Sequence, residues 1–172
     1  KVYNKKIVKI NMVFGWIIGI VLAVIVIMFI YYYNRLVTLS NQIDNSLSQI
    51  DVQLKKRSDL VPNLLASVKG YMKHEKGIIT EVTNARKALI GATTIESKVK
   101  AGTELGNALK SIFALSENYP QLRANENFLQ LQQELTSIEE KVAYARQFYN
   151  DGILSYNNAC TTFPGKLFAS IY

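Results

Sequence analysis

The chain has 172 residues, of which 49% are hydrophobic and 19% are charged, a composition typical of one ordinary folded domain. Its 3 Pro and 9 Gly exclude collagen-like and linker-like chains and disfavour most all-β folds, which need frequent turn residues. The single Cys excludes an internal disulfide, and one Cys with one His is too few for a zinc site without carboxylates.

The formal charge of +7 belongs mainly to the N-terminal end of the chain. Four lysines and no acid occur among the first nine residues, whereas residues 34–172 hold 16 basic and 13 acidic side chains. Mixed charges of that kind are typical of a solvated helical surface. No segment alternates basic and aromatic residues, so we expect no nucleic-acid partner. We interpret residues 1–11 as a basic flank.

A strongly apolar segment follows the flank. Residues 12–30, MVFGWIIGIVLAVIVIMFI, contain no charge and as a helix would extend roughly 29 Å, about the hydrocarbon thickness of a bilayer. Trp16 near one end and Tyr31, Tyr32 and Tyr33 at the other are placed where aromatic rings anchor a span at the headgroups. A secretory signal usually has a shorter apolar core and a small-residue cleavage site. The pattern therefore predicts a single transmembrane helix over residues 12–33.

Small residues recur on one side of this span. Gly15, Gly19 and Ala23 are four residues apart, a pattern that lets two helices approach closely in lipid. We interpret them as candidates for helix association. The second pair with this spacing, Gly102 and Gly106, lies in a later helical segment and is a further candidate.

The basic residues on the two sides of the span favour one orientation only weakly. The N-terminal lysines, with Arg35 alone soon after the span, favour an inside N-terminus and a domain on the outer side. If translation starts at Met12, those lysines are lost, and Arg35 with the basic run Lys55–Arg57 favours the reverse.

Heptad spacing predicts a first helix over residues 36–69. Eight of its ten seam positions are apolar, which is typical of a coiled-coil-like helix. Pro62 lies inside this segment and removes the hydrogen bond to the Ser58 carbonyl. We therefore expect a bend there, or a new helix with Asp59 as its N-cap.

Three further periodic segments predict helices over 72–91, 94–117 and 124–162. Gly91 either interrupts or ends the first of them, and Thr93 with Glu96 fits a capping box for a fresh start. The expected fold is all-α: one transmembrane helix that continues into an elongated antiparallel bundle of three to four long helices over residues 34–172.

Several blocks in order resemble one known family. They are IDVQLKKRSDLVPNLLASVKGYMKHEK at 50–76, VTNARKAL at 82–89, ELTSIEEKVAYARQFYND at 134–151 and FPGKLFA at 163–169. This combination is similar to the LemA family of bacterial membrane-anchored proteins. The resemblance implies one N-terminal membrane helix, a bundle of long helices and a bacterial envelope location, and it implies no reaction. Family members often have a longer apolar tail after the FP segment than this chain, which stops at Tyr172.

Three arginines in the periodic segments need partners if they are buried. They are Arg57, Arg86 and Arg146, and we expect interhelical ion pairs that include Asp59 and Glu139. The carboxylates that can serve are Asp44, Asp51, Asp59, Glu75, Glu81 and Glu139.

Catalytic patterns are weak. His74 has no second histidine for a di-iron site and no nucleotide-binding motif for a histidine kinase. Glu139 and Glu140 are adjacent and point to different helix faces, so they make a poor acid and base pair. We expect no catalytic residue, cofactor or metal. The sequence favours a non-enzymatic membrane scaffold that associates with itself as a homo-oligomer; the alternative is an adaptor or regulator of another membrane protein, such as an envelope protease or a sensor.

Overall fold

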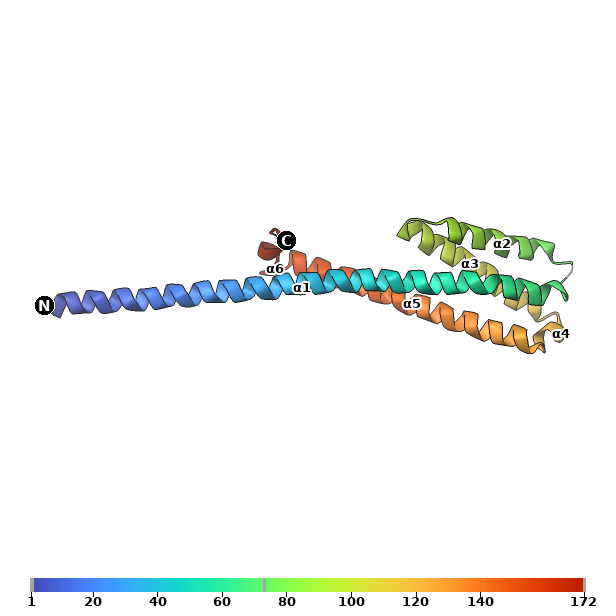
Figure 1. Ribbon diagram of the computed structural model, residues 1–172, viewed down its shortest axis with the longest axis horizontal. Helices are drawn as coiled ribbons and strands as arrows, with labels where there is room; N and C mark the ends of the chain where they lie inside the picture. Colours follow the sequence, from blue (N-terminus) through green and yellow to red (C-terminus); the bar gives the residue numbers. More distant parts are fainter. Residues whose placement is uncertain (1, 73, 172) are drawn as a thin grey trace. The chain divides into compact units, whose positions relative to one another are not determined.

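The computed structural model describes residues 2–72 and 74–171, with side chains described from Met12 onward. The all-α prediction is confirmed, since these residues form helices and no strand (Figure 1). The helices are α1 (Val2–Lys69), α2 (Lys76–Gly91), α3 (Ile95–Ser116), α4 (Pro120–Arg123), α5 (Glu126–Thr161) and α6 (Gly165–Ala169).

The chain forms two compact units. The first contains α1 up to Ile43 and the chain from Asp151 onward, and the second contains residues Asp44–Asn150. Helices α1 and α5 therefore each contribute one part to both units, and the expected bundle over 34–172 is shared between them.

The second unit is a bundle in which successive long helices alternate in direction (Figure 1). Contacts between α1 and α3 advance together, since Asp51 pairs with Lys98 and Arg57 bonds Gly102, so these helices run parallel. Contacts between α3 and α5 advance in opposite directions, from Thr103 with Arg146 to Lys110 with Glu139. This is the up-down-up-down order of four-helix bundles.

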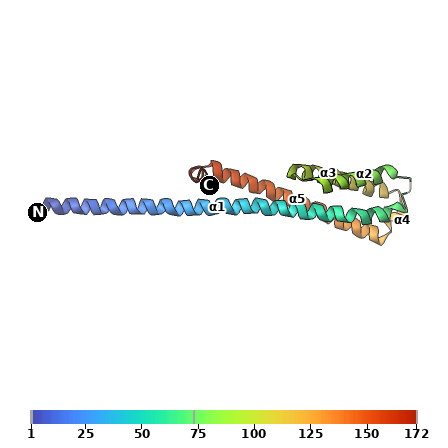
Figure 2. The ribbon, with the colours of Figure 1, turned by 45° about the horizontal axis from the view of Figure 1, so that its top comes forward.

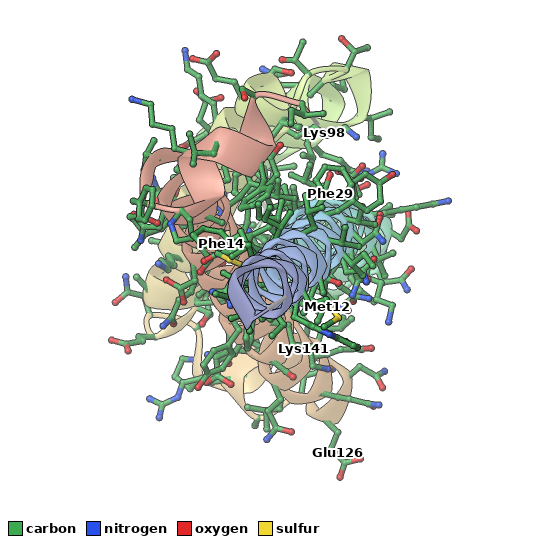
Figure 3. All side chains as sticks on the ribbon, turned by 90° about the vertical axis from the view of Figure 1, so that its left-hand side faces the viewer. Met12, Phe14, Phe29, Lys98, Glu126 and Lys141 are labelled. Carbon is green, nitrogen blue, oxygen red and sulfur yellow. The ribbon has the colours of Figure 1, made fainter. Side chains whose placement is uncertain are left out.

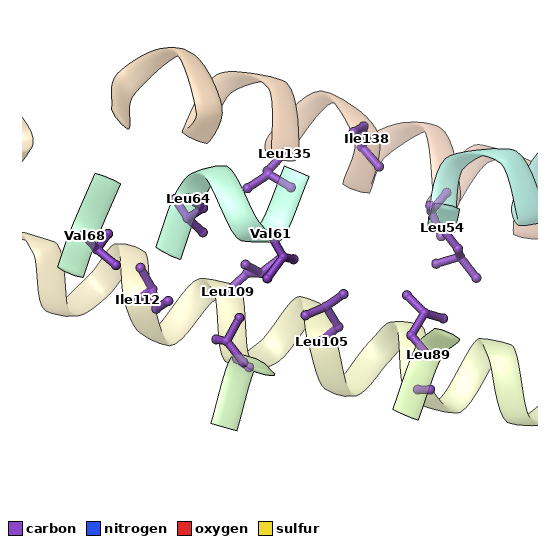
Figure 4. Packing of buried hydrophobic residues seen from close by; sticks show 14 of the residues in the cluster. Leu54, Val61, Leu64, Val68, Leu89, Leu105, Leu109, Ile112, Leu135 and Ile138 are labelled. Carbon is purple, nitrogen blue, oxygen red and sulfur yellow. The ribbon is translucent and has the colours of Figure 1, made fainter. Parts of the chain in front are cut away.

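All four long helices of this unit bury apolar side chains in one core (Figure 4). Figure 4 shows side chains of α1, α2, α3 and α5 that converge. The aromatic Phe128 is fully buried at the start of α5, where its ring meets that of Phe113 edge to face at 6.0 Å. The labelled members of the core are Leu54, Val61, Leu64, Val68, Leu89, Leu105, Leu109, Ile112, Leu135 and Ile138. Burial of these side chains provides the main driving force for the bundle.

Of the two alternatives at Pro62, a bend or a new helix that begins at Asp59, the second is wrong, because α1 continues through Pro62 to Lys69. The ring of Pro62 leaves the Ser58 carbonyl without its usual partner four residues on. The Nε of Arg86, from α2, donates a hydrogen bond to that carbonyl oxygen at 2.8 Å. A side chain from the neighbouring helix therefore replaces the missing backbone bond.

We expect this replacement to be measurable as an energetic coupling. The Arg86→Met substitution should lower the free energy of unfolding by about 2 kcal/mol, because it leaves the carbonyl of the buried Ser58 short of a donor. In a Pro62→Ala background the alanine N–H can bond the same oxygen, so Arg86→Met should cost much less there. A double-mutant cycle on urea unfolding checks this. Equal costs in both backgrounds would contradict the assignment.

The connection between α2 and α3 resolves the alternative at Gly91. Helix α2 ends at Gly91 and α3 begins at Ile95, so the middle segment is two helices. The capping box lies one residue later than expected, because Thr94 is the N-cap and its Oγ1 accepts a hydrogen bond from the Ser97 N–H at 3.2 Å. The Ser97 hydroxyl oxygen accepts from the Thr94 N–H in return, at 3.1 Å, and so takes the role expected of Glu96.

The first unit contains the apolar part of α1. By length and composition α1 can cross a membrane, and its most apolar window has a mean hydropathy of 3.1 with no residue buried. In Figure 3 the labelled Met12 and Phe14 side chains project outward from different sides of the helix. This is the surface expected of a span in contact with lipid.

The C-terminal part of α5 packs on α1 within this unit. A Cβ on Gly152 would lie 3.1 Å from Ile43, whereas one on Gly165 would lie 3.2 Å from the ring of Tyr32. The two helices are therefore antiparallel, as expected, and α6 lies against the part of α1 that follows the apolar window. Figure 2 shows α6 near the C-terminus, beside α1.

Candidate functional site

Arg57 is the most deeply buried charged residue among the described side chains, with 2% of its surface exposed. It lies on the seam of α1 and makes contacts to two other helices. Its Nη1 donates to the Gly102 carbonyl of α3 at 3.0 Å, and its Nη2 forms an ion pair with the Glu139 carboxylate of α5. One guanidinium thus ties three helices together.

Small residues of α3 make room for this pair. A Cβ on Gly106 would lie 3.2 Å from Arg57 Nη1 and 3.3 Å from Glu139 Oε2. A Cβ on Gly102 would lie 2.7 Å from a methyl group of Leu54. The four-residue spacing of these glycines therefore corresponds to close packing inside the bundle of one chain.

Arg146 is the second arginine of this region. Its Nη2 donates to the Val99 carbonyl at 2.9 Å and to the Thr103 hydroxyl at 3.2 Å, while its Nε is buried and has no hydrogen-bond partner among the described residues. Arg146 and Arg57 both line a cavity of about 120 Å³. Its remaining walls are Gly102, Thr103, Asn107, Lys110, Glu139, Val142 and Ala143.

The charges around this cavity act on one another. Burial lowers the pKa of the Arg57 guanidinium, Glu139 opposes that change, and the positive charge of Arg146 adds to it. The Nζ of Lys110 is 3.8 Å from Glu139, at an exposed position. The cluster can hold helices in register, because the arginines bond backbone carbonyls of α3 as well as charged side chains.

Only some of the residues expected to form one ion-pair cluster lie together. Arg57 and Glu139 are paired, and Arg146 is a neighbour that bonds α3. Arg86 bonds the Ser58 carbonyl instead, and Asp59 is exposed and forms none of the ion pairs in the described part of the chain. Asp59 lines a separate cavity of about 480 Å³ between α1, α2 and α3, where Asp51 pairs with Lys98 at 2.6 Å.

Most of the candidate residues of the span are exposed, in contrast to the buried residues around Arg57. A Cβ on Gly15 or Gly19 would meet nothing within 4 Å, and Ala23 is exposed, so this small-residue face is open. Trp16, Tyr31 and Tyr33 are also exposed, whereas Tyr32 packs on Phe168.

The sequence pattern missed several contacts that join distant segments. Examples are the pairing of Lys98 with Asp51 and the bond that the Tyr119 hydroxyl donates to Glu75 at 3.2 Å. Each joins exposed or half-buried side chains more than 40 residues apart, and spacing along the chain carries no signal for such pairs. The described residues contain no group of three or more His, Cys, Asp or Glu side chains that could hold a metal ion.

Comparison with known proteins agrees with the bundle. A model described as the LemA family matches residues 46–172. The chain belongs to the LemA family. The match includes Arg57, Glu139 and Arg146 as well as Arg86, and it begins after the apolar part of α1.

Individual proteins of related sequence have low identity to this chain. The protein LemA of Metamycoplasma hominis is 28% identical, with 87% of this chain and 70% of that protein covered. The magnetosome protein MamQ of Magnetospirillum gryphiswaldense is 25% identical, and MamQ 2 of Paramagnetospirillum magneticum is 23% identical; each covers 81% of this chain. The chain spans 61% of the length of these MamQ relatives.

Proposed function

We propose that this LemA-family protein is a non-enzymatic scaffold at the bacterial envelope, and that it associates with itself through its membrane span. The observation that carries the proposal is the open face of Gly15, Gly19 and Ala23 on a helix whose apolar window has no buried residue. No described helix of this chain covers that face. A second copy of the same span can approach it closely, because small residues allow backbone contact in lipid.

The bundle supports a role in binding more than one in catalysis. Its buried charges are used in contacts between helices, and the small cavity at Arg57 is lined by the groups that make those contacts. Because α1 is one helix from Val2 to Lys69, association of the spans also brings the bundles to a high local concentration.

The mass of the full-length protein, extracted gently from native membranes, tests the proposal. We expect particles that contain more than one copy of this chain and no other protein. The double substitution Gly15→Leu with Gly19→Leu should lower the mass, because bulk on this face prevents close approach. Val21→Leu with Val24→Leu adds bulk on the opposite face and serves as the control. Unchanged masses in both variants would rule out association through the glycine face.

One observation favours the second candidate, an adaptor for another membrane protein. Tyr144 and Phe148 are one turn apart on α5, and 64% and 68% of their surfaces are exposed. Exposed aromatic residues are frequent in protein contacts. An adaptor predicts a particle with one copy of this chain and a stoichiometric second protein, which is lost with Tyr144→Ser and Phe148→Ser. Mass photometry with protein identification of the same particle distinguishes the two candidates.

A further inference from the structure

The C-terminal segment, residues 163–171, exposes large apolar side chains at regular intervals. Phe163, Leu167 and Ile171 are four residues apart, and 83%, 58% and 70% of their surfaces are exposed. Single exposed apolar residues are ordinary on protein surfaces, but three large ones within nine residues of the chain, each with more than half of its surface exposed, usually mark a surface that is covered by something else.

The backbone of this segment is largely satisfied by its own hydrogen bonds. The N–H of Lys166 donates to the Thr162 carbonyl at 2.8 Å, that of Leu167 to Pro164 at 3.0 Å, and that of Ile171 to Phe168 at 3.1 Å. Backbone groups that are paired internally can enter an apolar layer at little cost.

The segment is attached to α1 where the apolar window gives way to the tyrosines. The ring of Phe168 is stacked on Tyr32, with centroids 5.3 Å apart and an interplanar angle of 8°, and it meets Phe29 edge to face at 6.1 Å. Gly165 also lies against α1, since a Cβ there would be 3.2 Å from the Tyr32 ring. The same Cβ would overlap the Ala159 carbonyl oxygen, so the close turn from α5 into α6 requires glycine. Aromatic rings at the end of a span lie at headgroup depth, so the attached segment lies at that depth as well.

The charges nearby suit the surface of a bilayer. From Gly152 to Tyr172 the sequence has one charged side chain, Lys166, which is exposed and precedes Leu167 in the sequence. On α1, Arg35 is exposed and donates to the Tyr31 hydroxyl at 3.2 Å. Lysine and arginine at this depth reach phosphate groups while their alkyl stems stay in the apolar layer.

We propose that residues 163–171 lie in the interfacial layer of the bilayer, beside the end of the α1 span, with Phe163, Leu167 and Ile171 in contact with lipid. The segment is a second membrane contact in addition to the span. We assign lipid as the partner of this surface because the segment packs directly on α1. The adjoining apolar surface of α1 is itself exposed and requires lipid. This inference rests on α1 crossing the membrane, and it is independent of self-association.

Lipid quenching in the full-length protein tests the proposal. In a Trp16→Phe background, which removes the single tryptophan, Phe163→Trp places one indole in the segment. The protein is reconstituted in phosphatidylcholine vesicles that contain some phosphatidylglycerol, with bromine on the acyl chains near the headgroups. Ile25→Trp, in the same background, reports the span, and Phe148→Trp is the matched exposed phenylalanine on the bundle.

We expect the Phe163→Trp variant to lose fluorescence to brominated lipid, as Ile25→Trp does, and to be protected from iodide in the water. Phe148→Trp should show the reverse. Quenching of Phe163→Trp by iodide without quenching by lipid would overturn the proposal. Protection from both quenchers would also overturn it, since it would mean that protein covers the segment. Failure of brominated lipid to quench Ile25→Trp would remove its premise, the span.

Discussion

We expect Glu139→Leu to lower the free energy of unfolding of the bundle by about 3 kcal/mol, because it leaves the buried guanidinium of Arg57 without its counter-charge. Only 3% of the Arg57 side chain is exposed, so water cannot replace the carboxylate there. The substituted leucine fills a similar volume, which separates the effect of charge from that of a cavity. Urea unfolding of the full-length protein in detergent, followed by circular dichroism, measures the change.

The neighbouring acid provides a matched control. Glu140 is exposed on the same helix and forms no ion pair within the described chain, so Glu140→Leu should change the free energy of unfolding by less than about 0.5 kcal/mol. If the two substitutions cost the same, the pair of Arg57 and Glu139 contributes nothing specific to the bundle.

Removal of the other partner of the ion pair, Arg57, should lower the free energy of unfolding by a smaller amount. Arg57→Met removes a charge whose burial is unfavourable, and it leaves behind a Glu139 side chain that is 44% exposed, where water can solvate the carboxylate. The lowered pKa of the Arg57 guanidinium agrees with this, because it means that burial disfavours the charged form. A base whose pKa is lower in the folded state than in the unfolded state destabilises the fold when it is charged. This destabilisation decreases only when the pH rises through the folded-state pKa and the group loses its proton. Arginine stays protonated near neutral pH, so Arg57 adds no pH dependence to the free energy of unfolding there.

Local patterns predict the helices but do not predict how they register. Apolar periodicity marks α3 and α5 because each has one buried face. Glu139 is one of six acids that could pair with Arg57, and the choice depends on the packing of helices whose paired residues are 82 positions apart in the chain. Pro62 is misleading for the same reason. The rule that proline ends a helix considers only the local backbone, whereas Arg86 of another helix supplies the missing donor.

The glycine pairs give the same lesson in sharper form. Gly15 with Gly19 and Gly102 with Gly106 have identical spacing, yet the first pair is open and the second is covered by α1 and α5. Spacing shows that close approach is possible, and only the fold determines whether the approaching partner is within the chain. The contact of Phe168 with Tyr32 has no signal in the sequence either, because the return of α5 along α1 brings together residues 136 positions apart.

Gly106→Leu should be as damaging as loss of the ion pair, for a different reason. Leucine needs space that Arg57 and Glu139 occupy, since even a Cβ would lie within 3.3 Å of both. Either the pair separates or α3 moves away from α1 and α5, and we expect a loss of about 3 kcal/mol from overpacking. Urea unfolding in detergent measures this loss.

A second glycine isolates the packing effect from helix propensity. Gly77 lies in α2 and is exposed, and a Cβ there would meet nothing within 4 Å. Gly77→Leu should therefore leave the free energy of unfolding unchanged or raise it by up to about 0.8 kcal/mol. Because both substitutions replace a helical glycine by leucine, the difference between them reports the space beside Arg57. Equal stability of the two variants would show that α3 does not need a small residue at position 106, and that the ion pair can rearrange around a larger one.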